Sequence, residues 1–179
     1  MSHRATIVRA RLEEPSMLRA REFLAAVLRS RALHVPWTHP PSTRSQYKAF
    51  VDRAKDKSRV SYLICTAEAE LAGVVNVSEI VRGAFCSGYL GYYAFVPNDG
   101  CGYMRAGLTK LVGLSFGKYR LHRLEANIQP ENARSIALVR SLGFRCEGYS
   151  SKYLKIGGRW RDHERWALTA ELWRSRGAG

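Results

Sequence analysis

The chain has 179 residues, 46% of them apolar and 11% aromatic, and lysine plus arginine exceed aspartate plus glutamate by 29 − 15 = 14. This length and composition exclude a disordered chain and predict one domain, residues 1–179, with a sizeable core. No stretch of 18 apolar residues and no signal-peptide pattern occur, so we expect a cytoplasmic protein. The positive charge favours a polyanion such as a phosphorylated cofactor or ribosomal RNA, or reflects only an arginine-rich solvated surface.

The N-terminal third predicts one strand and two helices. Partial alternation predicts a first strand over residues 6–12, and apolar residues at helical spacing predict an amphipathic helix to about residue 30. A proline-rich connection, 34–43, leads to a second helix that ends near residue 57. Residues 15–58 therefore form a helix, loop and helix ahead of the main sheet.

The middle of the chain predicts three strands and a helix. Residues 60–65 and 71–77 are rich in β-branched side chains and are joined by a short turn, which is typical of a hairpin. A third strand follows over 87–96. Apolar positions recur at helical spacing over 104–118, although two glycines interrupt this helix.

The stretch from residue 123 to 148, RLEANIQPENARSIALVRSLGFRCEG, predicts a strand that passes directly into a helix. The strand stops at Pro130, Asn132 is a suitable helix N-cap, and Gly143 is a suitable C-cap. Two further strands joined by a turn at Gly157 and Gly158 close the chain.

The four cysteines are widely spaced and form no C-x-x-C pair, and the five histidines are scattered. Such spacing is not typical of a metal site, so we expect reduced thiols and no bound metal.

Several motifs in the second half of the chain resemble one protein family. The residues concerned are Asn127, Pro130, Asn132 and Ser135 in N-x-x-P-x-N-x-x-S, the L-G-F-x-x-E-G sequence that follows, and YLKIGGRWRDH at 153–163. They resemble the GCN5-related N-acetyltransferases (GNAT), and within them the RimJ/RimL branch, whose RimJ-type members acetylate the N-terminal alanine of a ribosomal protein. The resemblance covers roughly residues 60–170.

The resemblance implies the GNAT fold, an α+β arrangement with one mixed, mostly antiparallel sheet of about seven strands flanked by helices. It also implies that residues 87–148 form the acetyl-CoA-binding core and that the loop PNDGCGYMR holds the pyrophosphate. Asp99 stands where the family has glutamine or arginine, and we expect its carboxylate to weaken that contact. The implied cofactor-binding residues are Tyr93, Phe95, Val96, Gly100, Cys101, Gly102, Tyr103, Met104, Arg105, Asn127, Asn132 and Ser135.

Two residues are implied in catalysis. By resemblance, the Ser135 hydroxyl protonates the departing thiolate of CoA, and Glu125 is the candidate general base. The alternatives are an ordinary serine in the first turn of a helix and a surface or ion-paired glutamate. Glu79 is a second candidate base.

The resemblance also implies that the acceptor enters across the early helical insertion and the final hairpin, with Trp37 and Trp160 as binding residues. The alternative is that both tryptophans are core residues. Residues 29–43 contain no aspartate or glutamate, and the last turn carries Arg159 and Arg161. This lack of carboxylates disfavours polycationic amines and favours a protein N-terminus, such as that of a ribosomal protein presented near RNA. The predicted function is an acetyl-CoA-dependent N-acetyltransferase acting on such an N-terminus, as a monomer or homodimer without a metal or a membrane partner. The alternatives are a GNAT enzyme for a small-molecule amine and a non-catalytic module that binds the ribosome or nucleic acid.

Overall fold

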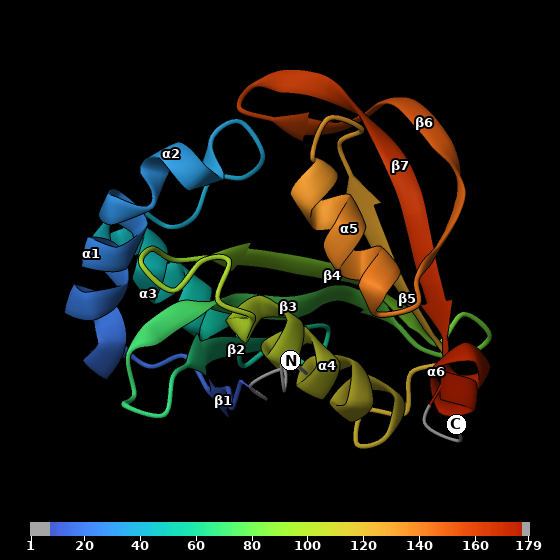
Figure 1. Cartoon of the computed structure of the whole chain (residues 1–179), viewed down its shortest axis with the longest axis horizontal. Helices are drawn as coiled ribbons and strands as arrows, with labels where there is room; N and C mark the ends of the chain where they lie inside the picture. The colour runs from blue at the N-terminus through green and yellow to red at the C-terminus, as the bar shows by residue number, and fades with distance from the viewer. Residues whose placement is uncertain (1–7, 177–179) are drawn as a thin grey trace, which may run out of the picture.

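The computed structural model describes residues 8–176, and its strands form one seven-stranded sheet. The strands are β1 (Arg11–Glu13), β2 (Val60–Cys65), β3 (Leu71–Val81), β4 (Ser87–Ala94), β5 (Arg123–Ile128), β6 (Arg145–Ile156) and β7 (Arg159–Thr169). They lie in the order β1-β2-β3-β4-β5-β7-β6, and every neighbouring pair is antiparallel except β4 with β5 (Figure 1). The mixed, mostly antiparallel sheet confirms the predicted fold class.

Helices pack on both faces of this sheet. They are α1 (Ala20–Arg29) with a preceding 3-10 turn at Met17–Arg19, α2 (Arg31–His34), α3 (Arg44–Arg53), α4 (Tyr103–Phe116), α5 (Ala133–Ser141) and α6 (Ala170–Arg176). Buried residues of α1 and α3 cluster with Leu63 and Val74, whereas those of α4 and α5 cluster with Ile64 and Val75. Because adjacent strand residues point to opposite faces, α1 and α3 cover one face and α4 and α5 cover the other.

The N-terminal third differs from the sequence prediction in two places. Of the strand predicted over 6–12, residues 6 and 7 lie outside the described residues, and β1 begins only at Arg11, where pairing with β2 begins. An unpredicted helical turn, α2, lies between the first predicted helix and the proline-rich connection. The second predicted helix is α3, and its N-cap Thr43 accepts a hydrogen bond from the Gln46 N–H at 3.2 Å.

The central strands follow the prediction with changed ends. β2 has the predicted bounds, and β3 continues four residues beyond Val77 because pairing with β4 resumes at Val81 and Ser87 after an irregularity. Glu79 lies within that irregularity, is exposed, and has a positive φ of 49°. β4 ends at Ala94, two residues earlier than predicted.

The C-terminal elements follow the predicted order and end in one helix more than was predicted. β5 leads into α5, and the long hairpin β6–β7 forms the edge of the sheet beyond β5, as Figure 1 shows. The additional helix is α6. Within residues 8–176, no helix has the length and apolar character needed to span a bilayer.

Candidate functional site

A cavity of about 520 Å³ opens where β4 and β5 separate. The two strands pair over only three positions, from Ser87 with Arg123 to Tyr89 with Glu125. Beyond that point, residues 90–94 of β4 and 126–128 of β5 line the cavity instead of pairing with each other. Because backbone groups at such a gap lack a strand partner, an extended ligand that carries amides can occupy it.

The loop between β4 and α4 forms one end of the cavity. Gly100 and Gly102 line it with φ values of 75° and 89°, a conformation that glycine adopts without strain, and Gly102 is the N-cap of α4. The first N–H groups of a helix have no partner within the helix and attract anions. Arg105, in the first turn of α4, adds a full positive charge to this wall.

Asp99 lies in the same loop and is paired with a side chain of α5. The Arg134 guanidinium approaches the Asp99 carboxylate to 3.3 Å, and Arg134 is 68% exposed whereas Asp99 is 22% exposed. Both residues line the cavity. The negative charge of Asp99 is therefore partly balanced by the positive charge of Arg134 from α5.

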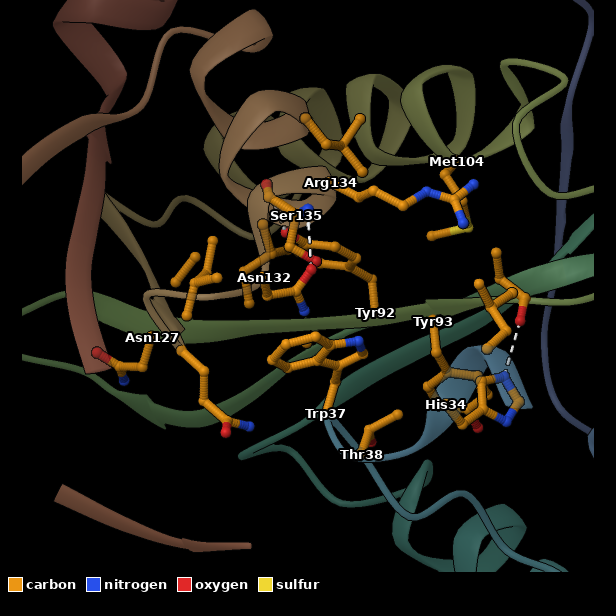
Figure 2. A pocket seen from close by; sticks show the side chains of 18 of the residues that line it. His34, Trp37, Thr38, Tyr92, Tyr93, Met104, Asn127, Asn132, Arg134 and Ser135 are labelled. Atoms are coloured by element: carbon orange, nitrogen blue, oxygen red, sulfur yellow. Dashed lines mark hydrogen bonds between the residues drawn. The ribbon is translucent and has the colours of Figure 1, made fainter. Parts of the chain in front are cut away.

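The N-terminus of α5 presents Asn132 and Ser135 to the cavity (Figure 2). Asn132 is the N-cap, and its Oδ1 accepts the Ser135 N–H at 3.1 Å. Within residues 8–176 the Asn132 Nδ2 has no hydrogen-bond partner, and the Ser135 hydroxyl has only the Tyr92 hydroxyl beside it, so both are available to a ligand. The Tyr92 hydroxyl donates to the Ser135 carbonyl at 3.3 Å. Burial raises the pKa of Tyr92 to about 12, so this hydroxyl keeps its proton at neutral pH.

Glu125, the candidate base, lies outside the cavity at the paired end of β5. Its carboxylate is 2.9 Å from the Arg123 Nε, and Arg123 also binds Glu147. Two residues further along β5, Asn127 does line the cavity, and its buried Oδ1 has no hydrogen-bond partner in the described part of the chain. Glu79 does not line the cavity either.

Some of the predicted cofactor residues make other contacts. Phe95 is fully buried in the cluster under α1 and α3, and its N–H donates to the Ala72 carbonyl. The Val96 N–H donates to the Ser30 hydroxyl at 3.0 Å. Neither residue lines the cavity, nor do Cys101 and Tyr103, whereas Tyr93 and Met104 do.

The two predicted acceptor tryptophans border a second hollow of about 370 Å³. Trp37 also lines the main cavity, where Figure 2 shows it below Asn132, so the two hollows share this wall. Trp160 lines only the second hollow and is 61% exposed. Glu131, Arg161 and Asp162 contribute charged groups there.

Sequence reasoning missed two buried histidines that line the main cavity, His34 and His163. The His34 Nε2 lies 2.8 Å from the Ala94 carbonyl (Figure 2), and the His163 Nδ1 lies 3.0 Å from the Arg161 carbonyl. Burial lowers the pKa of both rings. A lone histidine in a helical turn or a strand has no spacing signal, so only the folded arrangement identifies these two.

Residues 9–145 match the family model described as an acetyltransferase (GNAT) domain. The chain is 43% identical over 106 residues to a [ribosomal protein uS5]-alanine N-acetyltransferase of Escherichia coli, an alignment that covers 59% of this chain and only about half (55%) of that relative's length. It is 31% identical to the probable N-acetyltransferase YjcK of Bacillus subtilis, over 68% of this chain and 67% of the relative.

Two solved structures share the fold at higher coverage. Mycobacterium smegmatis RimJ in complex with CoA-disulfide superposes with a TM-score of 0.84 at 26% identity, covering 95% of this chain and 89% of that one. A ribosomal-protein-S5-alanine acetyltransferase from Vibrio fischeri gives 0.79 at 27% identity, covering 97% and 98%.

Proposed function

The chain belongs to the GNAT acetyltransferases, in their RimJ/RimL branch, and on that premise we propose that it transfers an acetyl group from acetyl-CoA to the α-amino group of a protein N-terminus. Alanine at the start of a ribosomal protein is the acceptor that we propose. The observation that carries this proposal is the cavity between β4 and β5, with the glycine loop and two helix N-termini at its wall. The single sheet supports treating residues 1–179 as one acetyltransferase domain.

The cavity wall fits the donor substrate. Gly100, Gly102 and the first turn of α4 offer backbone N–H groups to the pyrophosphate, and Arg105 and Arg134 supply positive charge. The open edge of β4 and the Asn132 Nδ2 are positioned for the amides of the pantetheine arm. When bound, acetyl-CoA supplies an activated acyl group as a thioester.

Ser135 and Tyr92 lie near the proposed thioester site and can act as hydrogen-bond or proton donors there. Ser135 provides a hydroxyl that can protonate the departing sulfur, in the first turn of α5 and next to the cap that holds this turn in place. Tyr92 supports the Ser135 carbonyl and stays protonated, so it serves as a donor and not as a base. An α-amino group has an ordinary pKa of about 7.7 to 8.0, so a sizeable fraction reaches the cavity uncharged at neutral pH.

The charges of the cavity favour a protein N-terminus over a polyamine. Among its described lining residues the one carboxylate is that of Asp99, which is already paired with Arg134. A polycation needs several free carboxylates, whereas a peptide needs room for its chain beyond the amine. The second hollow, between Trp37 and Trp160, provides that room. Of its two carboxylates, Asp162 is already bound to Tyr149 and to the Lys152 N–H, which leaves only Glu131 among the described lining residues for a polycation.

CoA release in the presence of three acceptors tests the proposal. The acceptors are a peptide that begins with alanine in a ribosomal-protein sequence, the same peptide with its N-terminus blocked and one lysine added, and spermidine. We expect turnover on the free N-terminus alone. Turnover on spermidine but not on the peptide would contradict the proposed acceptor, and failure to bind acetyl-CoA by calorimetry would contradict the proposed reaction.

A further inference from the structure

His163 lies in β7 at the acceptor side of the cavity. It is 3% exposed, yet it is one of the cavity-lining residues. Asn127 of β5 pairs with Arg165, and side chains of a strand alternate, so His163 points to the same face as Asn127. This is the face opposite α5, because Ala126 and Ile128 on the other face pack in the cluster that contains α5. His163 and Ser135 therefore approach the cavity from opposite faces of the sheet.

The hydrogen bond of His163 defines which of its ring nitrogens carries the hydrogen. Its Nδ1 lies 3.0 Å from the Arg161 carbonyl, and a carbonyl oxygen only accepts, so Nδ1 carries the hydrogen. Burial lowers the pKa of this ring, so it is neutral near pH 7 and Nε2 carries a free lone pair. Nε2 has no hydrogen-bond partner within residues 8–176.

The other groups around the ring leave Nε2 free. The Asp162 carboxylate raises the pKa of His163, but less than burial lowers it, and Asp162 is bound to the Lys152 N–H and to Tyr149. Tyr153 of β6 meets the imidazole edge to face at 6.3 Å between centroids. From β5, the uncharged Asn127 shares its face.

The remaining candidate bases are each excluded by a contact or by position. His34 donates from Nε2 to Ala94, and its Nδ1 is sealed from solvent without a partner among the described residues, so it has no route for a proton. Glu125 is paired with Arg123 outside the cavity, and Asp99 is paired with Arg134.

We infer that the Nε2 of His163 accepts the proton that the acceptor amine loses while its nitrogen bonds to the acetyl carbon. This inference rests on the proposed function. As the C–N bond forms, the N–H electron pair stays on nitrogen and the proton goes to Nε2. The C–S bond breaks, and its electron pair leaves on sulfur, which takes a proton from water or from the Ser135 hydroxyl, and in the second case Ser135 regains a proton from water. The imidazolium then returns its proton to solvent.

Two substitutions test this role. His163→Asn keeps an N–H donor near the position of Nδ1 and removes the base, and His163→Ala leaves space for free imidazole. We expect both variants to bind acetyl-CoA normally by calorimetry and to lose about 100-fold or more in kcat/KM on the alanine peptide. Added imidazole restores part of the turnover of His163→Ala. His122→Asn, at an exposed histidine paired with Glu171, is the matched control and keeps full activity.

The pH dependence separates a base from a structural residue. In the unmodified protein both the amine and His163 must be unprotonated, so log kcat/KM falls toward acid pH with a slope that approaches about two, and in His163→Asn with a slope of about one. Unchanged turnover in His163→Asn, or no rescue of a folded, acetyl-CoA-binding His163→Ala variant, would overturn the inference alone. No turnover by the unmodified protein would overturn the proposed function and the inference together.

Discussion

Asp99 and Arg134 set the charge that an incoming pyrophosphate meets at the loop before α4. In the sequence, the carboxylate of Asp99 stands alone and suggests repulsion. In the structure, the guanidinium of Arg134 reaches it from the first turn of α5, which is 35 positions later in the chain. Arg134 is exposed and Asp99 is half-buried, so the contribution of this solvent-accessible pair to folding is small, about 0 to 1 kcal/mol.

Removing each member of this pair should change acetyl-CoA affinity in opposite directions. Asp99→Asn removes a negative charge and frees Arg134 for the ligand, so we expect a several-fold lower dissociation constant. Arg134→Gln removes the cation and should raise the dissociation constant several-fold. Calorimetric titration at low salt measures both, with unfolding free energies expected within about 1 kcal/mol of the unmodified protein. Equal weakening by both substitutions would instead indicate that the ion pair shapes the loop.

The sequence could predict those site residues whose contacts lie within a few positions of the chain, but not those whose position depends on strands far apart in the sequence. The cap formed by Asn132 on Ser135 is a contact over three residues, so its pattern is readable in the sequence. The separation of Glu125 from the cavity depends on where β4 and β5 stop pairing, which no local pattern encodes. His163 faces the cavity because β7 lies beside β5, a neighbour 35 or more residues earlier in the chain.

At the scale of elements, the two interior glycines of α4 have different packing environments. Its two interior glycines weakened the helix prediction equally. In the structure, a Cβ on Gly107 would lie 2.4 Å from the Cδ1 of Ile64 on β2, whereas a Cβ on Gly113 would meet nothing within 4 Å. Gly107 therefore allows the close approach of α4 to the sheet, and Gly113 has no such packing role.

Alanine at these two positions should have opposite effects on stability. Gly113→Ala gains helix propensity and should stabilise the protein by about 0.5 to 1 kcal/mol, which is about 1 to 4 °C in Tm. Gly107→Ala gains the same propensity but overlaps Ile64, so we expect net destabilisation. Adding Ile64→Val, which removes the overlapping Cδ1, should recover part of that loss. Thermal denaturation of the three variants measures this, and stabilisation by Gly107→Ala would contradict the close packing.

The order of elements was predictable because hydrophobic periodicity is a local property. β2 has the predicted bounds because four of its six residues, Val60, Tyr62, Leu63 and Ile64, are β-branched, aromatic or leucine, and the structure buries all six. Strand ends that differ from the prediction are set by pairing with neighbouring strands. β3, for example, extends past Val77 because Val81 pairs with Ser87 of β4. Short α2, just before the proline-rich connection, and α6, after the last strand, have too few residues for a periodic signal.

At the scale of the whole molecule, two buried histidines should make stability fall as the pH decreases below about 6.5. Burial lowers the pKa of both His34 and His163, so the unfolded chain takes up protons first as the pH falls below about 6.5. Their stabilising contribution is complete above that pH and is lost as the pH falls toward the folded pKa values. Each histidine contributes a slope of at most about 1.4 kcal/mol per pH unit.

Carboxylates affect a different pH range. The Arg19 hydrogen bond lowers the pKa of Glu13, and the Arg123 hydrogen bond lowers that of Glu147, so their stabilising contribution is lost only below about pH 4.5. Urea denaturation at pH 7.5 and 5.5 therefore isolates the histidines. His34→Gln should remove part of the difference between the two unfolding free energies while keeping an amide donor for the Ala94 carbonyl. An unchanged difference in both His34→Gln and His163→Gln would show that neither ring is buried as described, and with that the basis for a neutral His163 at the cavity would be lost.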